Sequence, residues 1–261
     1  MMTDMTETSQ ILDDSEPWVI DASRLYYRDL NNQVRKFADQ GVRRFVLNNV
    51  KGQRYLCAGL SHNITVDIRG TPGEDMGVFM DGPKITVYGN AQNAVGNTMN
   101  DGRIVVHGMA GDVIGYGMRG GRIFVRDDVG YQVGIHMKGF LDKQPVIVVG
   151  GKAGDFLGEY MAGGCLVVLG ATTGGDRPIV GDYCAAGMHG GRLYVRGQVR
   201  PDRLGKEVRV FKLEEQDVQY LTPILKDFTR AFDRDLDIFD FRQYCKILPV
   251  STRPYGRLYA Y

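Results

Sequence analysis

The chain has 261 residues, enough for one large domain with an appendage or for two small domains. Its 32 Lys and Arg residues balance 31 Asp and Glu residues, so no net charge favours nucleic acid, an anionic membrane or an acidic substrate as a partner. The longest apolar runs, such as residues 146–149, are strand-sized and far shorter than the roughly 18 residues that a membrane-spanning helix needs. We therefore expect neither nucleic acid nor a membrane as a partner.

The N-terminal part predicts a leader and then a cap. Residues 1–18 carry acidic side chains where a secretory signal would be basic and then apolar, which indicates a cytoplasmic protein with a flexible leader. Asp21 and Ser23 precede apolar residues at helical spacing and predict a capped amphipathic helix. Residues 45–50 and 55–58 flank a Lys-Gly turn and favour a β-hairpin. Together, residues 19–58 would cover one end of the domain that follows.

Residues 59–197 hold all but four of the 35 glycines and carry a repeat whose step is 19 residues at first and 20 to 27 residues later. Apolar segments in this region end at Gly70, Gly89, Gly108, Asp127, Gly150, Gly170 and Gly197. In each segment the residues four and two positions before the end are apolar, as at Val66 and Ile68, which predicts a β-strand with one buried face. The intervening residues, such as Asp67, are mixed and would face outward.

A second landmark repeats in phase with the strands. It is a methionine, preceded three residues earlier by glycine in every repeat except the last, where Ala185 replaces it. The glycines are Gly77, Gly96, Gly115, Gly134 and Gly158, and the methionines are Met80, Met99, Met118, Met137, Met161 and Met188. Because sharp corners need positive φ or close backbone approach, we expect the glycines at corners and the methionines in the core.

A 19-residue unit of this kind cannot bury its apolar face alone. Stacking such units about 4.8 Å apart pairs each strand with its equivalents and lines up the inward side chains. The repeat therefore predicts an all-β solenoid, a parallel β-helix of about seven rungs, with an N-terminal α/β cap. Residues 198–261 lack the repeat; residues 214–233 predict a helix that folds back along the solenoid, and residues 241–261 an extended aromatic arm.

No motif for catalysis or metal binding is evident. The four cysteines, Cys57, Cys165, Cys184 and Cys245, form no CxxC pair, and the four histidines have no metal-ligand spacing. Residues 115–120 match GxGxxG, but a strand follows them where a dinucleotide site needs a helix. We expect no catalytic, cofactor or metal residues in this chain.

A polar ladder recurs three residues before each corner glycine or its Ala185 replacement and is broken at Tyr131. Its members are Glu74, Asn93, Asp112, Asp155 and Asp182. Calcium-binding β-rolls also repeat aspartates, but their nine-residue period is absent here. We therefore expect these side chains to hydrogen-bond the local backbone.

The run GDFLGEYMAGGCLVVLG at residues 154–170 resembles the GXGXG domain at the C-terminus of the glutamate synthase large subunit. Residues 79–82, FMDG, and 113–121, VIGYGMRGG, resemble other rungs, and residues 246–255, KILPVSTRPY, resemble stand-alone versions in split glutamate synthases. The resemblance implies a right-handed β-helix that scaffolds a glutaminase subunit and an FMN-barrel synthase subunit. FMN and iron–sulfur clusters would then reside in those partners, and no active site in this chain.

The same repeat is similar to the glycine-repeat subunit of formylmethanofuran dehydrogenase and to that of a formyltransferase/hydrolase complex. Residues 158–170 favour the glutamate synthase branch, in which a complex forms glutamate from glutamine and 2-oxoglutarate. Related stand-alone subunits serve N-methylglutamate synthase and other amidotransferase-like complexes, and the sequence alone leaves these alternatives open.

Overall fold

The computed structural model describes residues 16–250 apart from residues 62 and 173. In chain order its elements are β1 (Trp18–Asp21), α1 (Tyr27–Asp39), β2 (Arg44–Lys51), β3 (Thr65–Thr71), β4 (Asp81–Tyr88), β5 (Asp101–Val106), β6 (Arg122–Val125), β7 (Val146–Val149), β8 (Ala162–Val168), β9 (Gly190–Arg196), β10 (Val208–Lys212), α2 (Glu215–Phe232) and β11 (Tyr244–Pro249). Short 3₁₀ helices occupy Pro201–Arg203 and Phe241–Gln243.

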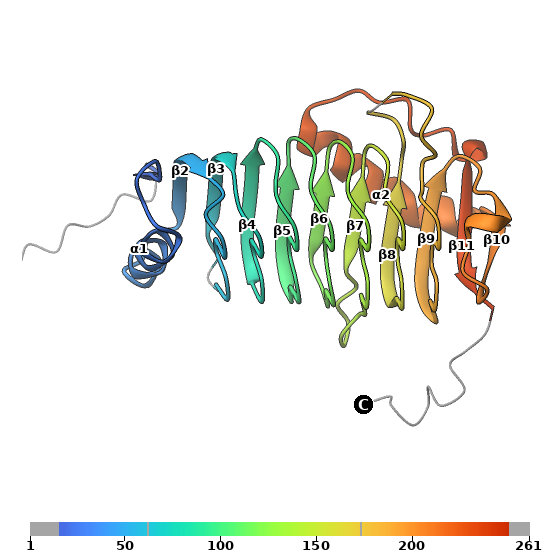
Figure 1. The fold of residues 1–261 in the computed structure, drawn as a ribbon, viewed down its shortest axis with the longest axis horizontal. Coiled ribbons are helices and arrows are strands. Elements are labelled where there is room, and N and C mark those ends of the chain that lie inside the picture. Colours follow the sequence, from blue (N-terminus) through green and yellow to red (C-terminus); the bar gives the residue numbers. More distant parts are fainter. Residues whose placement is uncertain (1–15, 62, 173, 251–261) are drawn as a thin grey trace, which may run out of the picture.

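Strands β1 to β9 pair in parallel, each with the next along the chain, in one 11-stranded sheet of order β1-β2-β3-β4-β5-β6-β7-β8-β9-β11-β10. The repeats are in register, so that Ile85 lies beside Ile104 and Ile104 beside Ile123. Strands β3 to β9 are joined by about six turns of a parallel β-solenoid. Figure 1 shows these strands side by side along the length of the molecule. The predicted all-β solenoid with an N-terminal helix and a C-terminal helix is confirmed.

Each turn has a corner in which the backbone is left-handed at three alternate residues. In the corner before β5, Ala94, Gly96 and Thr98 have φ of 57°, 67° and 51°. The same alternation recurs in every corner from residues 55–59 to residues 183–187. Only the middle position was expected from the sequence to have this backbone.

The alternation lets one corner bond the turns on both sides of it. The Gly96 amide donates to the Met76 carbonyl of the preceding turn at 2.8 Å. Two residues earlier, the Ala94 amide donates to the Asp112 carbonyl of the following turn, also at 2.8 Å. Buried backbone groups need such partners, so the left-handed residues follow from stacking the turns.

The N-terminal end differs from the expectation in two respects. The expected β-hairpin is wrong, because β2 lies parallel between β1 and β3, and residues 55–59 form the first corner of the solenoid. The expected helix cap is also wrong. Tyr26 is the N-cap of α1 without a side-chain hydrogen bond, whereas Asp21 Oδ1 accepts from the Ser23 amide and from Asn49 Nδ2, each at 3.0 Å.

Helix α1 nevertheless covers the end of the solenoid. Its buried face consists of Leu30, Val34 and Ala38, which belong to the same apolar cluster as the solenoid interior. Trp18 on β1 packs against Phe37 with ring centroids 4.2 Å apart and the ring planes tilted by 35°. The open end of the first turn is thereby shielded from water, as solenoid ends require.

At the other end, the first part of the extended arm expected over residues 241–261 contains a strand that docks on the solenoid of its own chain. Strand β11 lies between β9 and β10 and pairs antiparallel with both. The Val250 amide continues that pairing by donating to the Glu207 carbonyl at 2.8 Å. The remainder of the arm, residues 251–261, lies outside the described residues.

Helix α2 folds back across the outward face of the later strands, as the sequence predicted (Figure 1). On these strands the outward side chains are apolar, and they pack against α2 in a second buried cluster. The strand residues are Val105, Phe124, Val148, Val167 and Tyr194, and the helix residues are Leu221, Ile224, Leu225, Phe228 and Phe232. Phe124 meets Phe228 edge to face at 5.6 Å. The strands β5 to β9 are thus buried on both faces.

Candidate functional site

The five glycines expected at corners take the middle left-handed position of their corners. Gly77, Gly96, Gly115, Gly134 and Gly158 have φ between 67° and 72°. Each glycine carbonyl accepts a hydrogen bond, at 3.1 to 3.2 Å, from the amide of the methionine three residues later. This tight turn directs the chain from the corner back towards the sheet.

The methionines lie inside the solenoid. Met80, Met99, Met118, Met137, Met161 and Met188 are all fully buried. A methyl group added at Gly96 would lie 2.5 Å from Ile123 Cδ1, and one at Gly158 would lie 3.2 Å from Leu166 Cδ1. Ala185 occupies the same position in the last corner with φ of 59°. A residue with a Cβ is strained at this backbone conformation. These residues build the core and present no reactive group to solvent.

The cysteine thiols are poor nucleophiles at neutral pH. Burial raises the pKa of Cys57, Cys165 and Cys184 to about 12 each, well above the range in which thiolates form. Burial also raises the pKa of Cys245, which is half-buried. All four are free thiols.

The described histidines take part in packing contacts. His107 stacks on Tyr88 at 5.1 Å and meets Phe232 at 5.0 Å, and burial, with Arg126 and Arg234 nearby, lowers the pKa of His107. His189 Nδ1 lies 3.1 Å from a backbone carbonyl oxygen. Within residues 16–250, leaving out 62 and 173, no three His, Cys, Asp or Glu side chains are grouped so as to hold a metal ion. His62 is one of the residues left out.

The polar ladder bonds the next turn instead of the local backbone. Asn93 Oδ1 accepts from the Asp112 amide at 2.9 Å, and Asp112 Oδ1 accepts from the Tyr131 amide at 3.0 Å. Asp155 Oδ1 likewise accepts from the Asp182 amide at 2.8 Å. The expectation of local hydrogen bonds is therefore wrong, and the ladder joins successive turns of the solenoid.

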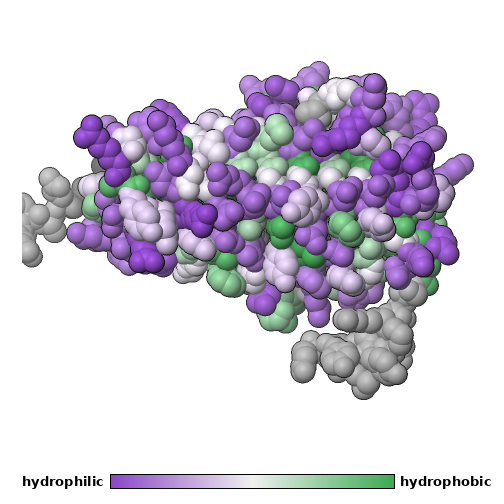
Figure 2. Space-filling model, in the orientation of Figure 1, coloured by the Kyte–Doolittle hydropathy of each residue, from purple (hydrophilic) through white to green (hydrophobic). Residues whose placement is uncertain are grey.

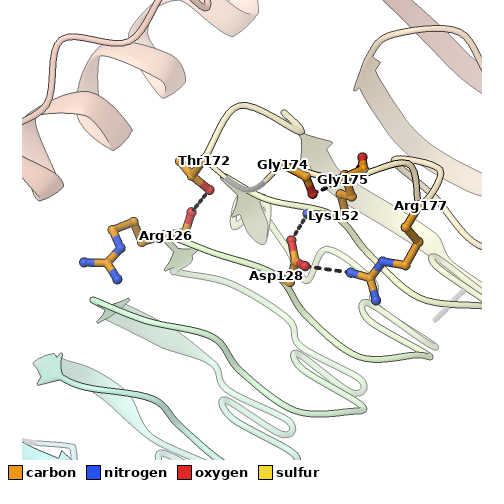
Figure 3. A network of polar contacts seen from close by, with 7 residues as sticks. All are labelled: Arg126, Asp128, Lys152, Thr172, Gly174, Gly175 and Arg177. Atoms are coloured by element: carbon orange, nitrogen blue, oxygen red, sulfur yellow. Dashed lines mark hydrogen bonds and ion pairs between the residues drawn. The ribbon is translucent and has the colours of Figure 1, made fainter.

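A polar network fastens the loop between β8 and β9 onto the solenoid (Figure 3). Lys152 is only 5% exposed, and its Nζ donates to the carbonyl oxygens of Gly174 and Gly175 at 3.1 and 2.6 Å. Asp128 accepts from the Lys152 amide at 2.7 Å and pairs with Arg177 at 2.8 Å. Because these groups bond one another, the network holds the loop in place.

A second buried polar group joins α2 to β9 and β11. Asp217 accepts from Tyr194 Oη at 2.7 Å and from Lys246 Nζ at 2.6 Å. Burial raises the pKa of the Asp217 carboxyl, but hydrogen bonds from the Glu214 amide, Lys246 and Tyr194 outweigh it and hold the pKa below its usual value. The ionised carboxylate of Asp217 therefore helps to hold α2 against β9 and β11.

The corners carry exposed aromatic side chains. We give the name aromatic corner to five aromatic residues of these corners, of which Phe156 is half-buried and the others are exposed: Tyr116, His136, Phe156, Tyr160 and Tyr183. The His136 ring lies between Tyr116 at 5.7 Å and Tyr160 at 5.3 Å, where it is stacked. Phe156 and Tyr183 stack at 4.9 Å. The rings form a surface that crosses successive turns.

Exposed apolar side chains also lie outside the aromatic corner, among them Phe79, Phe140 and Leu141. On the face seen in Figure 2, hydrophilic groups predominate and apolar groups occur in small patches among them. No helix among the described residues is long and apolar enough to span a membrane. The aromatic corner was not expected from the sequence, although one signal was present: each of its members stands one, two or five residues before one of the six methionines.

Comparison with known proteins places this solenoid in a family. The GXGXG motif family matches residues 29–249, and the chain belongs to that family. It is the type of domain found at the C-terminus of glutamate synthase. A protein from Methanocaldococcus jannaschii, named "Uncharacterized protein MJ1350", is 43% identical over 252 residues, which are 94% of this chain and 97% of that protein.

Proposed function

We propose that the chain is a non-catalytic scaffold subunit of a multi-subunit glutamate synthase. The observation that carries this proposal is the extent of the GXGXG domain, which takes up residues 29–249. Within that range the repeated residues build corners, core and contacts between turns. The solenoid suits a stiff support because the corners between its first and last are hydrogen-bonded to the turns on both sides.

In this proposal the chemistry belongs to two other chains. A glutaminase-type subunit would release ammonia from glutamine, and an FMN-barrel subunit would use it to form glutamate from 2-oxoglutarate. FMN and iron–sulfur clusters would be bound there, in a cytoplasmic complex. Transfer of ammonia between two active sites requires that the sites keep a fixed position relative to each other. A solenoid suits this role because it presents a long, rigid surface to both subunits.

Co-purification tests the proposal. The tagged chain is expressed with the glutaminase-type and FMN-barrel subunits of the same genome, and the material is examined by size-exclusion chromatography with light scattering. We expect one complex of fixed stoichiometry that contains all three chains. Elution of the chain apart from both candidates, or its assembly with formyltransferase-type subunits instead, would contradict the proposal.

A further inference from the structure

The aromatic corner contains side chains that the fold does not require. Left-handed backbone is costly for bulky residues, by roughly 1–3 kcal/mol each. Tyr160 has φ of 51° at the third left-handed position of its corner, and His136 has φ of 55° in the corner before it. The equivalent residues of three other corners are Gly59, Gly117 and Gly187. Glycine satisfies the same backbone without strain.

Burial does not offset this strain. Tyr160 is 48% exposed and Tyr183, at the first left-handed position of the last corner with φ of 57°, is 60% exposed. A ring that remains half in water gains only part of the stabilisation of a buried aromatic. The chain thus holds strained rings on its surface, a combination that points to binding.

The rings are also arranged in two stacks that run across successive turns. His136 and Tyr160 stack with an interplanar angle of 12°, and Phe156 and Tyr183 with an angle of 11°. Phe156 and Tyr160 stand at the first and third left-handed positions of the same corner, so each stack has one member there. Gly187 leaves room for the ring of Tyr160, because a Cβ at residue 187 would collide with it.

Carboxylates accompany the rings. Asp155 and Glu159 stand in the same corner as Phe156 and Tyr160, and Asp182 precedes Tyr183. Arg203 pairs with Asp182 at 2.6 Å. These four groups sum to two negative charges, which the negative faces of the rings reinforce. A cationic side chain is the complementary ligand, and a planar guanidinium can stack on the rings while it pairs with a carboxylate.

We propose that the aromatic corner binds an arginine-bearing segment of a partner subunit. This inference rests on the proposed scaffold function and specifies the surface that performs it. A second copy of the chain fits less well. A two-fold contact through this surface would set Asp155, Glu159 and Asp182 near the same residues of the copy and bring like charges together.

The test uses the three-subunit complex described above. The paired variant Tyr160→Leu/Tyr183→Leu keeps side chains of apolar character and removes both ring faces, whereas Tyr160→Phe/Tyr183→Phe keeps the ring faces. Tyr88→Leu is the matched control, because Tyr88 is 52% exposed but lies on β4. Affinity of the chain for its partners is measured by titration calorimetry.

We expect the paired leucine variant to bind about tenfold more weakly, since two cation–π contacts are lost. The paired phenylalanine variant and Tyr88→Leu should bind like wild type. Wild-type assembly with equal affinity for the paired leucine variant would overturn the assignment of this surface and leave the scaffold function standing. Failure of the wild-type chain to assemble would refute the scaffold function itself.

A second measurement needs no variant. Argininamide and the uncharged citrullinamide, at equal concentrations, are added to the wild-type complex. We expect argininamide to displace the partner and citrullinamide to have little effect. Equal effects of the two compounds would overturn the proposal. In a separate experiment, self-association of the isolated wild-type chain would also overturn it, if the paired leucine variant abolished that self-association.

Discussion

Tyr194 on β9 donates its hydroxyl hydrogen to Asp217 on α2 across 2.7 Å, inside the interface between helix and sheet. Lys246 on β11 reaches the other carboxylate oxygen of Asp217 at 2.6 Å. Three elements distant in the sequence are therefore joined at one buried carboxylate. Both the stability of the fold and its sensitivity to acid should depend on this group.

Removing the cation should destabilise the fold strongly. Lys246→Met leaves Asp217 buried beside Tyr194 without its counter-charge, and we expect a loss of about 3–5 kcal/mol in the free energy of unfolding. Lys246→Met/Asp217→Leu should recover much of this loss, because no unpaired charge remains. Urea unfolding followed by circular dichroism measures both variants. A single variant as stable as wild type would show that the ion pair is unimportant for docking of α2.

Acid should weaken the same contact. The pKa of Asp217 is lower in the folded chain than its usual value of 3.8, so its ionised form stabilises the fold above about pH 4. That contribution is lost as the pH falls through the folded pKa. We expect unfolding titrations between pH 7 and 2 to show a steeper acid loss for wild type than for Asp217→Asn. The exposed control Asp235→Asn should follow wild type; parallel curves for all three proteins would contradict this assignment.

The middle left-handed positions of different corners should differ in how well they tolerate a Cβ. Gly96→Ala places a methyl group 2.5 Å from Ile123 Cδ1 on a left-handed backbone, and we expect a loss of about 1–3 kcal/mol. Ala185→Gly removes a Cβ at the equivalent place and should leave stability within about 1 kcal/mol of wild type. Thermal unfolding compares the two. Equal losses at both sites would contradict the account of the corners.

The strained rings should contribute little to folding. In Tyr160→Gly the relief of left-handed strain opposes the lost ring contact and the greater entropy of the unfolded chain, so we expect a change within about 1 kcal/mol. Tyr88→Gly, in a strand, has no such relief and should destabilise more. Chemical denaturation ranks the two variants. A larger loss for Tyr160→Gly would mean that the ring serves the fold.

The repeat was predictable because it is local. Inward residues such as Val66 and Ile68 alternate within one strand, and the spacing of the methionines sets the turn length. The first turn was missed because Cys57 and Leu60 take the places of glycine and methionine there. A search for the spacing alone, without fixed residue types, would have included residues 55–60 in the solenoid.

The packing of α2 on the sheet corresponds to a pattern in the sequence of the strands. Outward positions are polar at Asp67 and Thr86 and become apolar from Val105 onward, where the helix lies. By contrast, the insertion of β11 between β9 and β10 depends on pairing between segments far apart in the sequence, which no local pattern specifies. The aromatic corner combines residues of four turns and depends on backbone strain that composition does not reveal.

The most direct test of the central claim is a reconstituted assay. Glutamate formation from glutamine and 2-oxoglutarate is measured with the purified glutaminase-type and FMN-barrel subunits, supplied with an electron donor, in the presence and absence of this chain. We expect no turnover by the chain alone, and coupled glutamate formation that requires its addition to the other two. Turnover by the isolated chain, or full coupled activity without it, would contradict the account.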